Sequence, residues 1–268
     1  MGASGLVPRI IRLRDGWGLV RTVRAQDGSR VRVMQVGGVY QSATYLDGRR
    51  MEPVFSYYRS FDHAFSVRPD TRRVLMVGGG GYAWPKHALA SGPADATVDV
   101  VELDAAVTRA ARRWFFLGEA MAAHPGRLRL VEGDGRTYLE GRALRMAGAG
   151  SGGASLAYDA IVLDAFCGAE PVRALATLEA ARAARACLVP DGLLMANVVS
   201  EREGEDVDFL RDVVATWREA FSHVFVVACE DEPFAVEDNY LVLATDGDWS
   251  VSDAIPYDDD FLGSVLRD

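Results

Sequence analysis

The sequence predicts an α/β protein with a doubly wound, Rossmann-like parallel sheet and a small N-terminal β-domain. Two observations support this fold class. From Arg72 onward, short continuous apolar runs alternate with helical stretches, as in parallel strands that helices cover on both faces. Before that point, runs rich in β-branched residues end in Asp-Gly or Gly-Gly turns, which is typical of a β-meander. We therefore expect two domains, residues 1–70 and residues 71–268.

The expected meander consists of four short runs. Their sequences are RIIRLRDG, GLVRTVRAQDG, RVRVMQVGG and VYQSATYLDG. A sheet of this size buries little apolar surface by itself, and its exposed edges need covering. We therefore expect it to pack on the rest of the chain or on a second subunit.

The second domain is expected to alternate strands and helices. Asp104 is a good N-cap for one of the helices, and Pro85 suits the first turn of another. A Gly-rich segment, 146–155, is expected to be a surface insertion. The expected parallel strands are 74–77, 97–102, 127–132, 160–164 and 193–199, the helices lie near 84–91, 105–117, 174–187 and 206–221, and an antiparallel edge pair comprises 224–228 and 239–244.

Composition excludes several classes of protein. No apolar run reaches the roughly 18 residues of a membrane span, and the N-terminus lacks the apolar core of a signal peptide, so we expect a cytoplasmic protein. The three cysteines are far apart and the four histidines have no ligand spacing, so we expect neither disulfides nor a metal site. The formal net charge of −9 disfavours nucleic acid as a partner and suits a cationic substrate.

A glycine run and a carboxylate mark a candidate nucleotide site. Gly78, Gly79, Gly80 and Gly81 follow the first parallel strand, where glycines allow a sharp turn and close approach of a ligand. Glu102 ends the second strand, 21 positions after Gly81, where a doubly wound sheet holds a ribose. Taken singly, the glycines are equally well explained as a tight strand-to-helix turn, and Glu102 is equally well explained as an ordinary acid at the end of a strand.

Two further acidic positions point to the same edge of the sheet. Asp134 and Gly135 follow the third strand, and Asp164 ends the fourth. Ligands of open α/β sheets bind beyond the carboxyl ends of the strands, so four features converge on one adenosine-type site. A P-loop is disfavoured because the glycines lack the G-x-x-x-x-G-K-[ST] pattern. The spacing does not exclude NAD, but a carboxylate near the reacting carbon suits an adenosyl-sulfonium cofactor better.

These motifs resemble one known family. VLMVGGGGYAWPKHAL, VDVVELDAAVTRAARRWF, LRLVEGDGRTYL and YDAIVLDAF together resemble the spermidine synthase (polyamine aminopropyltransferase) family, in particular its divergent bacterial members, over roughly residues 30–245. The resemblance implies a class I methyltransferase-type sheet that binds decarboxylated S-adenosylmethionine or S-adenosylmethionine, an amine acceptor and a homodimer. The residues that it implies are Gln41, Gly79, Gly80, Glu102, Leu103 and Asp134 at the cofactor, Tyr57 and Tyr58 at the amine, and Asp164 as the acid-base residue.

The sequence also departs from the pattern of that family. Gly81 stands where the family has an Asp that binds the aminopropyl amine, and Cys167 stands where it has a second Asp. Arg59 replaces an acid near the substrate tyrosine, and Glu170 would have to substitute for a missing carboxylate.

The expected reaction is transfer of an aminopropyl group to an amine, with release of 5′-methylthioadenosine and Asp164 as the base. The alternatives are methyl transfer from S-adenosylmethionine and a non-catalytic nucleoside-binding role. Aromatic rings at Tyr82, Trp84 and Phe166 are candidates to stabilise the cations, although core packing explains them equally well. We count Tyr82 and Phe166 among the substrate residues; the acceptor cannot be identified from the sequence.

Overall fold

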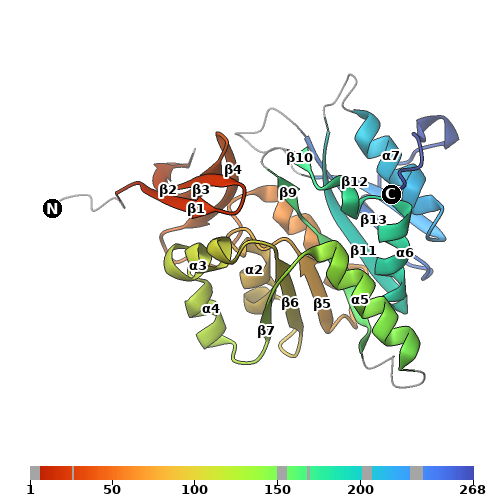
Figure 1. Cartoon of the computed structure of the whole chain (residues 1–268), viewed down its shortest axis with the longest axis horizontal. Helices are drawn as coiled ribbons and strands as arrows, with labels where there is room; N and C mark the ends of the chain where they lie inside the picture. The colour runs from red at the N-terminus through yellow and green to blue at the C-terminus, as the bar shows by residue number, and fades with distance from the viewer. Residues whose placement is uncertain (1–6, 26, 150–155, 168–169, 201–206, 230–237) are drawn as a thin grey trace.

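The computed structural model describes residues 7–25, 27–149, 156–167, 170–200, 207–229 and 238–268. A four-stranded antiparallel sheet lies at one end of the molecule, beside a seven-stranded sheet with helices on both faces (Figure 1). The predicted fold class is therefore confirmed. The division into domains at residue 70 stays a prediction.

The N-terminal sheet is the predicted meander. Its strands are β1 (Arg9–Leu13), β2 (Gly16–Arg24), β3 (Arg30–Val36) and β4 (Val39–Tyr45), paired antiparallel in chain order. A 3₁₀ helix, η1 (Ser56–Asp62), and the short helix α1 (His63–Ser66) then lead into the large sheet.

The large sheet has the order β12-β13-β11-β8-β5-β6-β7. Five of its strands are parallel, whereas β13 is antiparallel to both β11 and β12. The predicted antiparallel edge pair is thus confirmed. The strands are β5 (Arg73–Val77), β6 (Thr97–Glu102), β7 (Leu128–Glu132), β8 (Tyr158–Leu163), β11 (Leu188–Ser200), β12 (His223–Ala228) and β13 (Asp238–Thr245).

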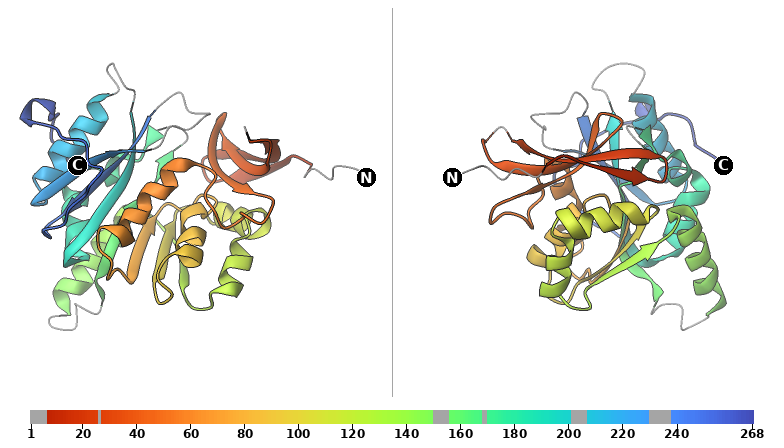
Figure 2. Two further views of the ribbon diagram at one scale, coloured as in Figure 1. Left: turned by 180° about the vertical axis from the view of Figure 1, so that it is seen from behind. Right: turned by 60° about the vertical axis from the view of Figure 1, so that its left-hand side comes forward.

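Two layers of helices cover this sheet (Figure 2). Alternate residues of each strand point to opposite faces, so Met76 packs in one apolar cluster with Trp84, while Leu75 packs in the other with Leu139. The first layer comprises α2 (Ala83–Ser91), α3 (Ala105–Trp114) and α4 (Leu117–Ala123), and the second comprises α5 (Gly135–Gly148), α6 (Leu178–Ala186) and α7 (Val207–Arg218).

Two helical expectations need correction. The helix expected over 105–117 is two helices, because Phe116 adopts a left-handed conformation with φ of 61° and starts a new helix. Sequence analysis also missed α5, whose last turn takes up Met146–Gly148, the start of the expected insertion; residues 150–155 lie outside the described chain. The expected N-cap at Asp104 is confirmed, since its side chain accepts the Ala106 N–H at 2.7 Å.

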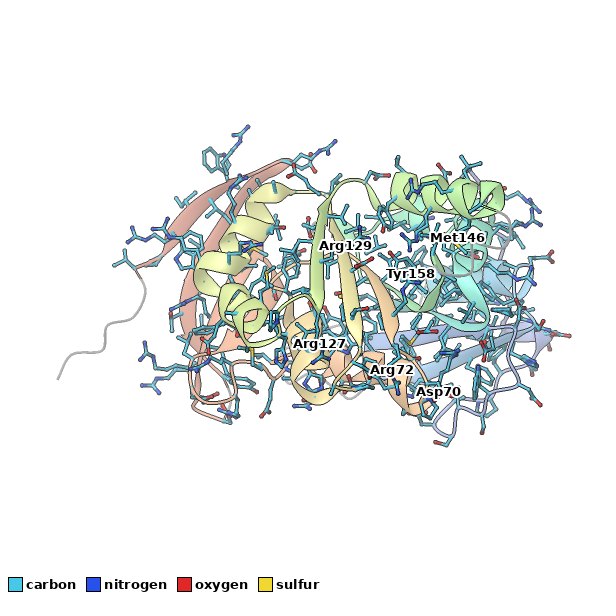
Figure 3. The ribbon with its side chains drawn as sticks, turned by 90° about the horizontal axis from the view of Figure 1, so that it is seen from below. Asp70, Arg72, Arg127, Arg129, Met146 and Tyr158 are labelled. Atoms are coloured by element: carbon cyan, nitrogen blue, oxygen red, sulfur yellow. The ribbon has the colours of Figure 1, made fainter. Side chains whose placement is uncertain are left out.

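The amino-terminal edge of the large sheet is closed by paired side chains. Figure 3 shows Arg72, Arg127, Arg129 and Tyr158 at this edge. Arg129 pairs with Asp99 at 2.5 Å, and the Tyr158 hydroxyl donates to the same carboxylate at 2.6 Å. A ligand site is therefore to be sought at the opposite, carboxyl edge. Within the described ranges, no helix is both long and apolar enough to cross a membrane.

Candidate active site

A cavity of about 400 Å³ lies between the carboxyl edge of the large sheet and the N-terminal sheet. This is the edge where open α/β sheets bind ligands. Its size falls within the range of small-molecule sites. Ten of the residues expected from the sequence line it, namely Gln41, Tyr57, Tyr58, Gly78, Gly80, Glu102, Leu103, Asp134, Gly135 and Asp164.

Gly78 brings the glycine turn against the end of β8. Its φ is 97°, and a Cβ at this position would lie 2.1 Å from the carbonyl oxygen of Asp164. Only glycine permits both this conformation and this approach. The Asp164 N–H donates to the Val77 carbonyl at 2.9 Å, so the two strand ends are fastened side by side. The acid is thereby held next to the glycine turn.

Glu102 organises the glycine turn as well as lining the cavity. Its Oε2 accepts the N–H groups of Gly79 at 2.8 Å and Gly80 at 3.3 Å, and its Oε1 accepts the Asp104 N–H at 2.8 Å. Burial raises the pKa of Glu102, although the three backbone donors favour the charged form. A carboxylate can accept about four hydrogen bonds, so Glu102 can still accept one from a hydroxyl group of a ligand. Gly79 serves here as a donor to Glu102 and does not itself line the cavity.

Asp134 lies at the cavity as the N-cap of α5. Its Oδ1 accepts the Thr137 N–H at 2.7 Å, and this bond lowers the pKa of the carboxyl group. Asp134 therefore carries a negative charge at neutral pH beside the positive end of the helix. Leu103 is 41% exposed and adds an apolar contact nearby. This pair suits a heterocyclic base: Asp134 can accept a hydrogen bond from the edge of the base, and Leu103 can pack against its face.

Asp164 is the acid with the most perturbed environment in the cavity. Burial raises its pKa to about 7, despite weak hydrogen bonds that favour the charged form. The Tyr57 hydroxyl donates to Oδ2 and the Asn197 amide donates to Oδ1, both at 3.5 Å. A carboxyl group that is close to half-protonated near neutral pH can both accept and release a proton.

The N-terminal sheet and η1 form the roof of the cavity. Tyr57 and Tyr58 stack with ring centroids 4.2 Å apart, and burial raises the pKa of Tyr58 far above its usual range. Gln41 comes from β4. Sequence analysis missed Arg14 and Asp15, which line the cavity from the turn between β1 and β2. The only sequence signal there was the Asp-Gly turn, which gives no indication of what the turn contacts.

Gly81 does not line the cavity, and the structure supplies a reason for glycine at this position. A Cβ there would lie 2.3 Å from Ser42 Oγ and 2.9 Å from Ser42 Cβ, and Ser42 is fully buried in β4. The roof strand therefore fills the space that a side chain at position 81 would need. The acid that the resemblance leads one to expect there has no room.

Several other expected residues are not brought to the cavity. Tyr82 is fully buried, and its hydroxyl shares a hydrogen bond of 2.7 Å with Thr108, away from the cavity. Arg59 pairs with Glu52 at 3.6 Å on the surface. The side chains of Phe166, Cys167 and Glu170 lie outside what the structure describes, although their backbones form the small hairpin of β9 (Phe166–Cys167) and β10 (Glu170–Pro171).

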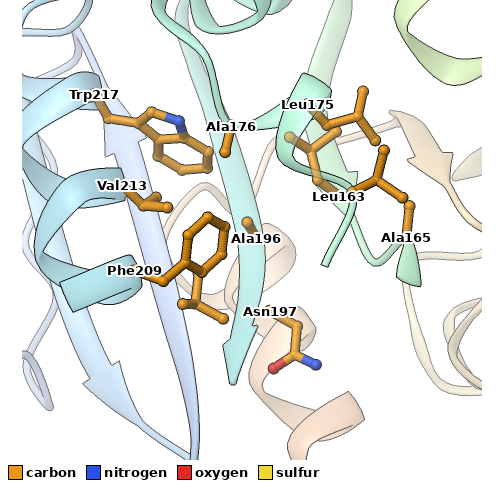
Figure 4. Close-up of a pocket in the computed structure, with 11 residues that line it drawn as sticks. Leu163, Ala165, Leu175, Ala176, Ala196, Asn197, Phe209, Val213 and Trp217 are labelled. Atoms are coloured by element: carbon orange, nitrogen blue, oxygen red, sulfur yellow. The ribbon is translucent and has the colours of Figure 1, made fainter. Parts of the chain in front are cut away.

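Figure 4 shows a second, smaller cavity, which shares lining residues with the first. It holds about 30 Å³, roughly the share of one water molecule. Ala165, Val172 and Leu175 line both cavities. Asn197, the hydrogen-bond partner of Asp164, lines the smaller one, together with mostly apolar side chains that include Phe209 and Trp217. In the parts of the chain that are described, no group of three or more His, Cys, Asp or Glu side chains is arranged to hold a metal ion.

Comparisons with known proteins show what the chain resembles in sequence and in fold. No family model matches the chain. A polyamine aminopropyltransferase of Vibrio vulnificus (strain CMCP6) is 29% identical over 185 residues, which are 69% of this chain and 55% of that protein. A probable spermidine synthase from Corynebacterium glutamicum ATCC 13032 superimposes with a TM-score of 0.70 at 21% identity, covering 92% of this chain and 82% of that one. The chain is thus similar in sequence to polyamine aminopropyltransferases and in fold to spermidine synthases.

The spermidine synthase-like fold is also related to that of methyltransferases. Human methyltransferase-like protein 13, in complex with SAH, superimposes with a TM-score of 0.57 at 20% identity over 75% of this chain and 86% of that one. The predicted class I methyltransferase-type sheet is thus confirmed. The chain spans about half the length of the curated relatives that it matches.

Proposed function

We propose that this protein is an aminopropyltransferase, which moves an aminopropyl group from decarboxylated S-adenosylmethionine to a small amine and releases 5′-methylthioadenosine. One observation carries the proposal: Asp164, with its pKa raised to about 7, lies on the same cavity as Glu102 and Asp134. A proton acceptor and two nucleoside-type contacts thus share one site. The curated relative, named a polyamine aminopropyltransferase, supports the same reaction class.

The residues of the cavity fit an adenosyl donor. In the proposal, Glu102 accepts a hydrogen bond from a ribose hydroxyl with its remaining acceptor capacity, and Asp134 accepts one from the amino group of the base. Leu103 contacts the face of the base, and Gln41 closes the site from the roof. The donor supplies an electrophilic methylene carbon next to a sulfonium sulfur.

Asp164 prepares the nucleophile in the proposed reaction. An alkylamine has a pKa of about 10, so the acceptor arrives as an ammonium ion. Asp164 takes one of its protons, while the Tyr57 hydroxyl donates to the other carboxylate oxygen. The neutral nitrogen then attacks the methylene carbon: a C–N bond forms, the C–S bond breaks, and the electron pair stays on sulfur. Holding the two reactants in line lowers the barrier further.

We also propose, from the sequence, that the acceptor is a cationic amine, that the protein is a cytoplasmic homodimer, and that it has no nucleic-acid partner. The net charge of −9 favours attraction of a cation over attraction of a polyanion.

Calorimetry and product analysis test the proposal together. The expected result is that decarboxylated S-adenosylmethionine binds, and that methylthioadenosine forms from it only when an amine is added. Preference for S-adenosylmethionine with a methylated product would instead establish methyl transfer. Tight nucleoside binding without product from any amine would establish a non-catalytic role.

A further inference from the structure

The turn between β1 and β2 belongs to the wall of the larger cavity. Leu13 pairs with Gly16, so the turn consists of Arg14 and Asp15, and both of these residues line the cavity. The backbone N–H of Arg14 donates to Asp104 Oδ2 at 2.6 Å. The turn is therefore fastened to the segment that follows β6, at the carboxyl edge of the large sheet.

This place on the sheet is remote from the reacting end of the cavity. The strand order is β8-β5-β6-β7, so the end of β8, where Asp164 lies, and the end of β6 are two strand spacings, or roughly 10 Å, apart. The N–H of Asp104 in turn donates to Oε1 of Glu102, the acid proposed for the ribose. Arg14 is therefore placed beside the base and ribose of a bound nucleoside, away from the sulfonium sulfur.

The charge of Arg14 stands out in this cavity. Among the described residues that line it, Arg14 is the only basic one, whereas five are acidic. The pKa of the Asp134 carboxyl group is lowered chiefly by the Thr137 N–H and also by the positive charge of Arg14. Within the described ranges, no group accepts a hydrogen bond from the Arg14 guanidinium or forms an ion pair with it. Its N–H donors are thus available to a ligand that lies against Asp134.

We propose that Arg14 and Asp134 together recognise adenine: Asp134 accepts a hydrogen bond from the 6-amino group, and the Arg14 guanidinium donates one to a ring nitrogen beside it. This inference rests on the proposed function and adds a specificity-determining residue to its nucleoside site. Adenine presents the amino donor between two acceptors, N1 and N7, so an acceptor and a donor side by side match either edge. The base is neutral, so an arginine does not repel it as it would repel the sulfonium.

The test compares methylthioadenosine with its 1-deaza and 7-deaza analogues, each of which replaces one ring nitrogen by C–H. Calorimetry should show that one of the two analogues binds the wild type about tenfold more weakly, the scale expected for loss of a hydrogen bond from a charged donor. Arg14→Met keeps the length of the side chain but removes its donors. This variant should bind methylthioadenosine about tenfold more weakly than the wild type does, and it should bind the same analogue as tightly as methylthioadenosine.

Arg12→Met is the matched control. Arg12 lies in the same hairpin, but its guanidinium packs on the ring of Trp17, 4.9 Å from the centroid, and it does not line the cavity. This variant should keep the wild-type affinity for all three ligands. Arg14 is exposed at a turn, so Arg14→Met should also keep the wild-type melting temperature. Arg14→Gln, which retains a neutral N–H donor, should show an intermediate penalty.

Two outcomes would overturn the inference. One is that neither analogue binds the wild type more weakly than methylthioadenosine does. The other is that the penalty of the weaker analogue persists in Arg14→Met. The proposed function fails separately, if the wild type binds methylthioadenosine but forms none from decarboxylated S-adenosylmethionine and an amine. A wild type that binds none of the three ligands would overturn both.

Discussion

At the scale of single residues, Asp164 makes the sharpest prediction. Asp164→Asn keeps the shape of the side chain but removes the proton acceptor, so turnover should fall by about 10²–10⁴, the usual contribution of a positioned base. In the wild type, turnover should rise as the pH increases through about 7, where Asp164 loses its proton. Steady-state kinetics between pH 5.5 and 8.5 check both, and full activity of Asp164→Asn would refute the mechanism.

The raised pKa of Asp164 also has a consequence for stability. The folded protein holds this proton up to about pH 7, whereas the unfolded chain releases it near pH 4. Between these values the folded state binds more protons, so this group lowers stability as the pH rises. Asp164→Asn should therefore raise the melting temperature more at pH 8 than at pH 4. An equal shift at both pH values, measured by thermal denaturation, would contradict the burial of this carboxyl group.

Glu102 should contribute to both nucleoside binding and the order of the glycine turn. Glu102→Ala removes the acceptor of three backbone N–H groups. It should weaken methylthioadenosine binding by about 1.5–3 kcal/mol, the scale of hydrogen bonds to charged groups, and it should lower the melting temperature. Glu132 is a matched control, because it pairs in register with Glu102 at the end of β7 but is exposed and does not line the cavity. Glu132→Ala should leave affinity unchanged.

Sequence position alone found the acids of this site but not all of its polar groups. Glu102, Asp134 and Asp164 each follow a buried strand, and parallel strands bring their carboxyl ends to one edge. Asn197 lies inside an apolar run, where its type and place gave no sign of a neighbouring acid. Tyr82 shows the opposite case, because it follows the glycine turn directly in sequence and was therefore expected at the substrate. Its backbone is left-handed, with φ of 57°, and its side chain packs in the core.

At the scale of elements, the contact between β4 and the glycine turn predicts a coupled pair of substitutions. Gly81→Ala places a methyl group 2.3 Å from Ser42 Oγ and should cost about 1–3 kcal/mol, as overpacking usually does. Ser42→Gly opens the space, so the double variant should be more stable than the sum of the single losses implies. Urea denaturation of the four proteins measures the coupling. Additive losses would show that Ser42 does not fill this space.

Strand patterns were easier to predict than helices. Five apolar runs marked the parallel strands because both of their faces are covered, and β6 (Thr97–Glu102) has the expected bounds. Helix α5 was missed because Gly141 and Gly148 interrupt its pattern and weaken helix propensity. The break between α3 and α4 depends on the left-handed conformation of Phe116, which the residue type does not favour.

At the scale of the whole molecule, one buried lysine side chain fastens the N-terminal sheet to the large one. Lys86 of α2 is 2% exposed. Its Nζ donates to Thr44 Oγ1 at 3.2 Å and to the carbonyls of Arg50 at 3.3 Å and Phe115 at 2.6 Å. Burial lowers the pKa of Lys86 to about 7. The roof of the active-site cavity is thus held in place by contacts that a local sequence pattern does not reveal.

The N-terminal part of the chain differs from the rest in charge, and its sheet exposes large apolar side chains. Residues 1–50 carry nine arginines and three acidic residues, a net charge of +6, whereas the remaining chain carries −15. Ile10 is 72% exposed and Trp17 is 60% exposed, and both line an apolar groove of about 660 Å³. Exposed apolar patches of this kind mark interaction surfaces.

The face of the N-terminal sheet that carries this groove should be part of the predicted dimer contact. Trp17→Glu adds a charge at the centre of the groove, which would be buried without a partner in a dimer, so it should shift the protein towards a 29 kDa monomer. Leu144→Glu is the control: Leu144 is 75% exposed on α5, which belongs to the other part of the chain, and it should leave the association unchanged. Light scattering at micromolar concentration distinguishes the two species. A wild type that is already a 29 kDa monomer would contradict the prediction, and a dimer that tolerates Trp17→Glu would move the contact to another surface.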